Sequence, residues 1–466
     1  MTNISFLITT IITLSIVSYA GIKSSKKVTS SKDFTLGSRQ FTSSQVSSSI
    51  IGTLVGGAST IGTAQSAFIS GFNGMWFTIG ASAGCIFLGF FLSKPLREAE
   101  IHTIPEFMAR YYGPTSRIIS SSISSLAIFI HITGQVIASV AILTTLFTVG
   151  ENTAVIITML LILSYIFFGG FLGSSIVGSI KTILLYVTLL FSGFVVISNF
   201  GGVNSYISAF PKDPWFNLFS SGIFSSLARG FSLVIGVSST QTYLQAVFSG
   251  KSPSESRKGS FIAAILIPPI GFLSTLIGMF MKHAHPNIIS KQALPIFVLE
   301  YLNPFIGGIV IATLIISVVA TGAGLTLGIS TMFCRDIYSK FSKDIIGGKK
   351  EILVNRISVI IISILVSLMV FLNLDSLILK WAFLSMTLRG TVIFVPLIFA
   401  LLLKKRTPKK FGYISMIASP LITIILSVFN LIEIAPLYIG LGVSLLIFII
   451  GYMKIWIYTI DVVYMI

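Results

Sequence analysis

The sequence predicts an all-helical integral membrane protein with about thirteen transmembrane helices, each needing about 20 mainly apolar residues. Its 466 residues are 54% hydrophobic and only 10% charged, and the mean hydropathy is +0.96. Basic residues gather in loops that alternate along the chain, which is typical of a multi-pass membrane protein. Two of the predicted helices also contain runs of glycine and hydroxyl residues, which indicate a binding site inside the membrane.

Hydropathy places the apolar spans along the whole chain. They are 4–21, 43–71, 75–93, 118–148, 153–170, 176–198, 222–248, 259–281, 306–333, 353–372, 376–403, 411–430 and 436–454. The first span precedes a basic stretch instead of following one, which is the reverse of a cleaved signal peptide, so we expect it to be retained. The loops after the odd-numbered spans carry most of the basic charge. This pattern predicts a protein of the cytoplasmic membrane with its N-terminus outside and its C-terminus inside.

Composition and spacing exclude several other classes of function. The net charge of +17 lies in loops that flank the membrane, so the expected surroundings are the lipid bilayer and a small-molecule solute, with no nucleic acid. Cys85 and Cys334 lie in or beside apolar segments and indicate neither a disulfide framework nor a zinc site. None of the 14 acidic residues lies at the centre of a predicted span. An intramembrane enzyme would need a catalytic carboxylate pair or metal cluster, so we predict no catalytic residue and no cofactor.

Two spans are expected to be broken within the membrane. Span 43–71 contains GTLVGGASTIGTAQSAF, and span 222–248 contains GFSLVIGVSSTQTYLQ. Unwound backbone at membrane depth survives only where it is buried or lines a water-filled cavity. Glycine-interrupted helices in corresponding positions of two halves therefore favour a transport site near the midplane. The alternative is close helix packing through small residues.

Six segments resemble motifs of the sodium/solute symporter family, which includes bacterial proline, sugar and sialic-acid carriers. They are GGASTIGTAQSAFISG, TIPEFMARYYG, SYIFFGGFLGS, QTYLQAVFSGKSPSES, GLTLGISTMFCRDIY and VPLIFALLLKKRTPKKFG. The resemblance implies a LeuT-like fold of two inverted five-helix repeats, with a broken first helix in each. The implied division is an extra helix and loop at 1–42, repeats at 43–198 and 222–403, an external loop at 199–221, and C-terminal helices and a tail at 404–466.

The resemblance also implies a sodium site between span 43–71 and span 306–333. Its backbone ligands would be Ala58, Ile61 and Ser317, and its two hydroxyl ligands would come from the positions of Ala320 and Thr321. Ala320 has no side-chain oxygen. The position at which several relatives carry an aspartate is Gly178, so this sequence lacks an acid as well.

A lysine stands close to these missing ligands. Lys181 follows Gly178 by three residues, so it projects from nearly the same helix face about one turn deeper. Our hypothesis is that its ammonium group replaces the cation and contacts the carbonyls of Ala58 and Ile61 and the hydroxyl of Thr321. Burial without an acid partner favours the neutral form of an ammonium group, so Lys181 could couple transport to H+ instead of Na+. The alternative is that Lys181 snorkels to the cytoplasmic interface, and Na+ is then the coupling ion.

Other polar residues at membrane depth are candidates for binding a solute. Arg389 lies near the middle of span 376–403, where a guanidinium costs several kcal/mol unless it meets an anion, backbone carbonyls or water. A solute carboxylate would suit its planar fork, and loop carbonyls are the alternative. His131 and Gln135 share one face of span 118–148, with interhelical hydrogen bonding as the alternative. The remaining candidates are Ser59, Thr63, Gln65, Ser238 and Gln241 in the two broken spans.

The expected function is ion-coupled symport of a small organic solute, with a carboxylate-bearing solute favoured. The alternative is a membrane sensor or regulatory protein that keeps the symporter fold and transports nothing. Such a protein would have little need for polar residues around broken helices. Accumulation of a solute against its gradient would separate the two.

Overall fold

The computed structural model describes residues 4–25, 39–147, 149–341, 348–404, 407–429 and 434–464. Within these ranges the chain is helical, and the β-type pairing consists of one isolated bridge between Phe41 and Gly250. Ten of the described helices are long and apolar enough to cross a membrane, or eleven when one bent pair is counted as a span. The predicted all-helical membrane class is confirmed, while the count of thirteen spans stays a prediction.

The described residues of the first half of the chain form eight α-helices. They are α1 (Ile4–Ser25), α3 (Ser43–Leu54), α4 (Thr63–Ser70), α5 (Trp76–Phe87), α6 (Ser93–Glu98), α7 (Ile104–Tyr112), α8 (Pro114–Phe147) and α9 (Glu151–Asn199). Short π- or 3₁₀-turns join some of them, namely η2 (Ala58–Gly62), η3 (Gly71–Met75) and η4 (Leu88–Leu92). The two apolar stretches of α9, Glu151–Ile166 and Ile176–Asn199, correspond to two of the predicted spans.

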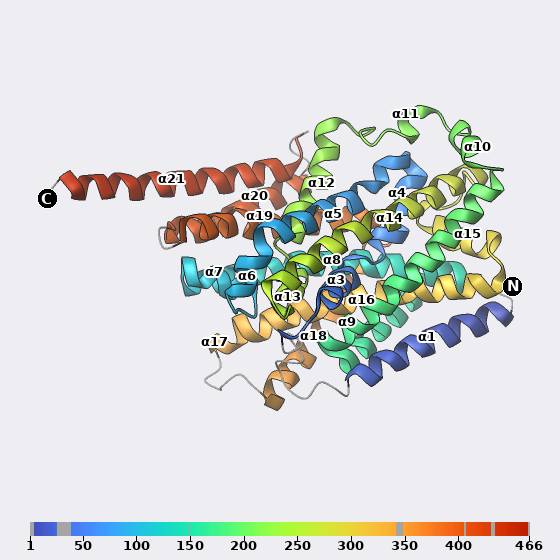
Figure 1. Ribbon diagram of the computed structural model, residues 1–466, viewed down its shortest axis with the longest axis horizontal. Helices are drawn as coiled ribbons and strands as arrows, with labels where there is room; N and C mark the ends of the chain where they lie inside the picture. Colours follow the sequence, from blue (N-terminus) through green and yellow to red (C-terminus); the bar gives the residue numbers. More distant parts are fainter. Residues whose placement is uncertain are drawn as a thin grey trace.

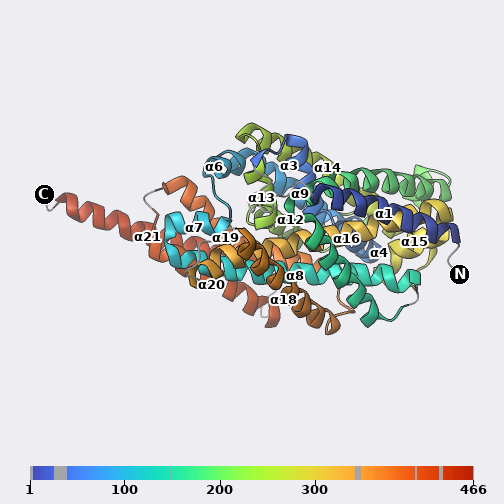
Figure 2. The same ribbon diagram turned by 90° about the horizontal axis from the view of Figure 1, so that it is seen from below.

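The second half contains the remaining helices. They are α10 (Val203–Ser208), α11 (Lys212–Trp215), α12 (Ile223–Val237), α13 (Gln241–Ser249), α14 (Pro253–Ala284), η5 (Ser290–Gln292), α15 (Ala293–Tyr301), α16 (Pro304–Met332), η6 (Phe333–Tyr338), α17 (Ser339–Phe341), α18 (Gly348–Phe371), α19 (Ile378–Leu403), α20 (Lys409–Phe429) and α21 (Pro436–Tyr464). The long helices run along the long axis of the molecule, and the two termini lie at opposite ends (Figure 1, Figure 2). The α6–α7 end is the end near the C-terminus, and the α10–α11 end is the opposite one.

Burial separates central helices from peripheral ones. In the apolar windows of α8 and α16, 83% of the residues are buried, against 22% in α1 and 28% in α21. The outer helices expose large apolar side chains such as Ile11, Ile16 and Leu446. Apolar surface on this scale would be unusual in water and is suited to contact with lipid. Helices α8 and α16 therefore form the centre of the bundle.

Both helices that were predicted to be broken are interrupted in the structure. Helix α3 ends where Val55 adopts an extended conformation (φ −88°, ψ 100°), and the chain continues through η2 into α4. Gly56 is required at this break, because a Cβ atom on it would lie 2.4 Å from Gln135 Oε1. The second break lies between α12 and α13, which meet at an angle of 47° across residues 238–240. Each break frees backbone carbonyls that a continuous helix would have used.

The two broken helices are joined at the α6–α7 end. The Phe41 amide, just before α3, donates a hydrogen bond to Ser249 O at the end of α13 (3.0 Å). The Lys251 amide donates to Phe41 O (2.8 Å). This pair of bonds, the Phe41 bridge, connects two segments that are about 200 residues apart in the chain and would otherwise have unpaired backbone groups.

Candidate functional site

Lys181 of α9 lies fully buried at the first break. Its Nζ donates to Gly52 O at 2.9 Å, to Ser317 O at 3.1 Å and to Thr321 Oγ1 at 2.9 Å. An ammonium group has three donors, so all of them are satisfied. The Thr321 and Ser317 hydroxyls each donate to Val55 O, at 3.1 and 3.2 Å. Lys181 is therefore part of a closed polar network, and the snorkelling alternative is wrong.

Close packing of α9 on α3 allows the lysine to reach this break. A Cβ atom on Gly178 would lie 2.5 Å from Ser48 O, so a side chain at this position would push the two helices apart. The aspartate that the resemblance implied for relatives therefore has no room here. One turn further along α9, Lys181 extends into the space beside the break. The close packing of α9 on α3 therefore explains both why position 178 has no acid and how Lys181 reaches the break.

The structure corrects two of the expected partners of Lys181. The carbonyls on its ammonium group include that of Gly52, while those of Ala58 and Ile61 do not contact it. The Ala58 carbonyl accepts a hydrogen bond from Thr63 Oγ1 at 3.1 Å instead. The reason is geometric, because the acceptor that the first broken helix provides lies in the last turn of α3, before the break, and not in the π-turn that follows it.

The second missing ligand, Ala320, faces away from the polar network. Its methyl group packs with Val17, Val177 and Ile316. This apolar contact joins α1, α9 and α16. The position thus supplies helix packing in this protein and no oxygen to the first break.

Arg389 of α19 is fully buried at the second break. Its Nη1 donates to Thr240 Oγ1 at 2.8 Å, and its Nη2 donates to Ser385 Oγ at 2.9 Å and to His131 Nδ1 at 2.8 Å. Because a guanidinium group only donates, His131 Nδ1 must accept, which places the proton of the neutral ring on Nε2. His131 Nε2 is buried and has no hydrogen-bond partner. The structure thus brings His131 of α8 and Arg389 of α19 together, a contact that the sequence did not predict.

Neither buried cation has an acidic partner among the residues that the structure describes. Within the described part of the chain, the ion pairs involve neither Lys181 nor Arg389. Both charges are balanced by neutral hydrogen-bond acceptors only. A buried cation in such surroundings has an unbalanced charge that an anionic ligand can neutralise.

Two of the predicted solute-binding glutamines are bonded to backbone amides. Gln135 Oε1 accepts from Gly57 N at 2.7 Å, so it satisfies an amide that the first break leaves free. Gln65 Oε1 accepts from Ile378 N at 3.1 Å and caps the start of α19. The Gln135 Nε2 group is buried without a partner. Gln135 therefore stabilises the break and still has donors available for a ligand.

Gln241 and the candidate hydroxyls are engaged elsewhere. Gln241 Oε1 accepts from Ile104 N at 2.9 Å, and its Nε2 donates to His102 O at 3.0 Å, so this side chain ties α13 to the segment before α7. The structure thus gives Gln241 a packing role, while its expected contact with solute stays a prediction. The hydroxyls of Ser59, Thr63 and Ser238 donate to carbonyls of their own helical segments, those of Gly56, Ala58 and Val234.

Charged residues close the α6–α7 end around the same segment. Asp336 of η6 accepts from Arg117 Nε of α8 at 2.7 Å, and Arg335 pairs with Glu351 at 2.9 Å. Burial, together with the nearby charge of Arg335, lowers the pKa of His102 to about 4. His102 is therefore neutral near pH 7, and the pairs at this end are not disturbed by an additional positive charge.

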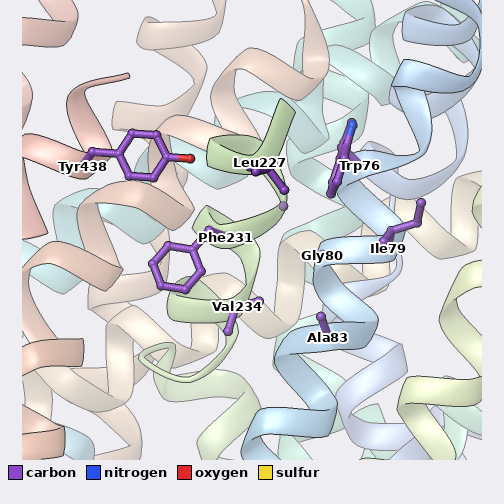
Figure 3. A pocket seen from close by; sticks show the side chains of 9 residues that line it. Trp76, Ile79, Gly80, Ala83, Leu227, Phe231, Val234 and Tyr438 are labelled. Atoms are coloured by element: carbon purple, nitrogen blue, oxygen red, sulfur yellow. The ribbon is translucent and has the colours of Figure 1, made fainter. Parts of the chain in front are cut away.

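An apolar pocket of about 470 Å³ lies apart from both breaks, between α5, α12 and α21. Trp76, Ile79 and Ala83 line one side, and Leu227, Phe231 and Val234 face them, with Tyr438 across the opening (Figure 3). The Trp76 indole donates to Leu218 O and the Tyr438 hydroxyl to Phe224 O. Because its polar groups are already bonded, this pocket offers no partner to a polar solute.

The bundle of apolar helices, two of them broken beside buried polar clusters, defines a membrane transporter fold. The structure is similar to that of a Na+-coupled sialic acid symporter in a substrate-bound outward-open state (TM-score 0.84, 16% identity, 98% of each chain covered). It is also similar to Mhp1, a nucleobase-cation-symport-1 family transporter in a closed conformation (TM-score 0.57, 12% identity, 90% of this chain and 94% of that one). These matches confirm the predicted LeuT-like fold class.

The family follows from the sequence itself. The model of the sodium:solute symporter family matches residues 34–417, which is well over half of the chain. The protein therefore belongs to the sodium:solute symporter family, as the motifs predicted. Its membership makes it a multi-pass membrane protein of an ion-coupled solute symporter family, while the division into two repeats stays a prediction.

Proposed function

We propose that this protein carries a small organic carboxylate across the cytoplasmic membrane and that Lys181 takes the place of the coupling sodium ion. The observation that supports this most is the pair of bonds from Lys181 Nζ to Ser317 O and Thr321 Oγ1. Both oxygens belong to the set that the family resemblance assigns to sodium. The expected coupling is then to protons, or transport is independent of sodium.

Electrostatics support this replacement. A sodium ion that used the same oxygens would lie within about 4 Å of the ammonium group, where two unit charges repel by about 4 kcal/mol at an effective dielectric constant of 20. The carbonyl of Gly52 and the hydroxyl of Thr321 are also already bonded to Lys181. A neutral amine would keep two N–H donors and lose its charge, so loss of a proton from Lys181 would free one of its three acceptors. It would also remove the positive charge from the site, as the departure of a bound cation would.

The second break is the proposed binding site of the solute carboxylate. Arg389 provides a planar fork suited to two carboxylate oxygens, and its present partners include the side chains of Thr240 and Ser385, which can rotate away. The unpartnered donors His131 Nε2 and Gln135 Nε2 would add neutral hydrogen bonds. Basic residues of α6, α7 and η6 favour placing the α6–α7 end in the cytoplasm, with the N-terminus outside.

The test is a comparison of thermal stability in detergent, with sodium against choline at equal ionic strength. A ligand that binds only the folded state raises stability by mass action. We expect the parent protein to be indifferent to sodium and the Lys181→Ala variant to be stabilised by it, because the variant regains an empty cation position. Equal stabilisation of both proteins by sodium would show that the ion binds elsewhere and would overturn the replacement.

A second arm tests transport. Proteoliposomes containing the parent protein should accumulate at least one member of a panel of small carboxylates when the outside is made acidic, with choline as the only other cation. The corresponding amides serve as neutral controls. Accumulation that requires sodium, or that does not distinguish carboxylates from amides, would contradict the proposal.

A further inference from the structure

A polar cavity of about 480 Å³ opens at the α10–α11 end, beside the first broken helix. Gln65 and Ser66 of α4 lie on one side, Arg229 of α12 and Phe383 of α19 lie on others, and Lys380 lies at its exposed rim. We call this cavity the outer vestibule. Its volume is in the range of small-molecule sites, and its lining includes cationic and polar side chains.

Two cations with no acidic partner in the described residues set the charge of the outer vestibule. Arg229 Nη1 donates to Asn73 Oδ1, which holds the guanidinium group at the wall. Lys380 is exposed, and the described ion pairs include neither residue. Both also line a neighbouring cavity of about 290 Å³. A cleft with charge of one sign and low-dielectric walls concentrates ions of the opposite sign.

The helices that carry these two cations also lead to the polar cluster of the second break, which consists of Arg389 and its partners Thr240, Ser385 and His131. Lys380 and Arg389 both belong to α19 and are nine positions apart, which is about 13 Å at 1.5 Å per residue. Arg229 belongs to α12, which ends at the second break, where Thr240 binds Arg389. An outer pair of cations thus lies on α12 and α19, the helix that leads to Thr240 and the helix that carries Arg389.

We propose that the outer vestibule is a capture site in which Arg229 and Lys380 bind a small organic anion before it reaches Arg389. This inference rests on the proposed transport of a carboxylate and adds a second, outer binding site for it. The fixed charges would select anions at the opening, and the fork of Arg389 would then recognise the carboxylate at depth.

The first experiment measures charge selectivity with a thiol inside the outer vestibule. A Ser66→Cys variant is treated with the anionic reagent MTSES and the cationic reagent MTSET. The rate with MTSES divided by the rate with MTSET is then compared with the same ratio for a Ser205→Cys control on α10. The native Cys85 and Cys334 are buried, and the parent protein gives their background. We expect the ratio to be about fivefold higher in the vestibule, which is a modest value because salt screens exposed charges. Adding Arg229→Gln and Lys380→Gln should abolish the difference, and an unchanged ratio would overturn the proposal.

The second experiment tests binding of an anion, with benzoate as the probe and benzamide as its neutral analogue. Benzoate should slow the MTSES reaction of the Ser66→Cys thiol in a saturable way, benzamide should not, and the Arg229→Gln, Lys380→Gln background should lose the protection. Absence of protection by benzoate would mean that the vestibule attracts anions without binding them, and the capture site would be rejected. Neither readout needs transport, so failure to transport a carboxylate would reject the proposed function and leave the outer site standing.

Discussion

The two breaks hold one buried cation each, but their surroundings differ in kind. At the first break, Lys181 is bonded to two backbone carbonyls and one hydroxyl, and its three donors are saturated. At the second break, Arg389 is bonded mainly to side chains, those of Thr240, Ser385 and His131. A site built from backbone holds its occupant in one position, whereas a site built from side chains can exchange its partners for a ligand. This difference supports the proposed division of roles, with a fixed charge at the first break and recognition of solute at the second.

The largest expected effect comes from emptying the backbone-lined site. Lys181→Ala should lower the free energy of unfolding by about 4 kcal/mol, because it leaves a cavity and removes the three hydrogen bonds of the ammonium group. Lys181→Met keeps most of the volume without the charge and should lose about half as much. Thermal unfolding in detergent measures both. A Met variant as stable as the parent would show that the ammonium bonds give no net stability.

The side-chain-lined site should respond in ligand binding more than in stability. Arg389→Lys keeps the charge and loses the planar fork, so the affinity for a carboxylate that stabilises the parent should fall about 100-fold, or about 2.7 kcal/mol. Thermal-shift titrations with the carboxylate and its amide give this value. An unchanged affinity in the Lys variant would make Arg389 a packing residue and would remove the contrast between the two breaks.

The close contact of α9 with α3 provides a sharper test of the first site. Gly178→Ala places a methyl group 2.5 Å from the position of Ser48 O, and such overpacking costs about 1–3 kcal/mol. Gly442→Ala on α21 is the matched control, because its Cβ atom would meet nothing within 4 Å. It should leave stability unchanged or raise it by up to about 1 kcal/mol, because alanine is the better helix former. Equal stability of the two variants would show that the helices can separate and that the position of Lys181 is not imposed by packing.

The smallest effect concerns one unpartnered donor at the second break. His131→Asn keeps an acceptor for Arg389 and removes the Nε2 proton, so carboxylate affinity should fall about tenfold, or about 1.4 kcal/mol, at nearly unchanged stability. His131→Leu also leaves a guanidinium donor unpaired and should lower the stability as well. If the Asn variant binds carboxylates as well as the parent does, His131 serves only to hold Arg389.

Sequence patterns were sufficient where the signal was local. Gly56 and the hydroxyl run at residues 238–240 predicted both breaks, because small residues mark places where the helix cannot continue. The spacing of Lys181 from Gly178 predicted its direction and its contact with Thr321. The family motifs predicted the LeuT-like fold, which the structural neighbours confirm.

Predictions failed where the partner came from a distant part of the chain. Gln241 lies beside the hydroxyl run of the second break, so the sequence predicts that it binds a ligand. Its side chain bonds the backbone of residues 102–104, and no feature of its own helix indicates these partners. The acceptors of Lys181 were assigned to the wrong side of the first break, because the extended conformation of Val55 decides which carbonyls are free. Arg229 and Lys380 were not singled out, since each alone is an ordinary basic residue and only the fold brings them to one cavity.

The Phe41 bridge links the two broken helices mechanically. It fastens the start of α3 to the end of α13 by two backbone hydrogen bonds, so the inner segments of both broken helices form one lever at the α6–α7 end. A movement of α13 away from the bundle axis would pull α3 with it, so it would disturb the network around Lys181 and the contacts of Arg389 together. The Phe41 bridge would therefore couple the position of the Lys181 ammonium group to binding of the proposed solute at Arg389, although the bridge contacts neither group.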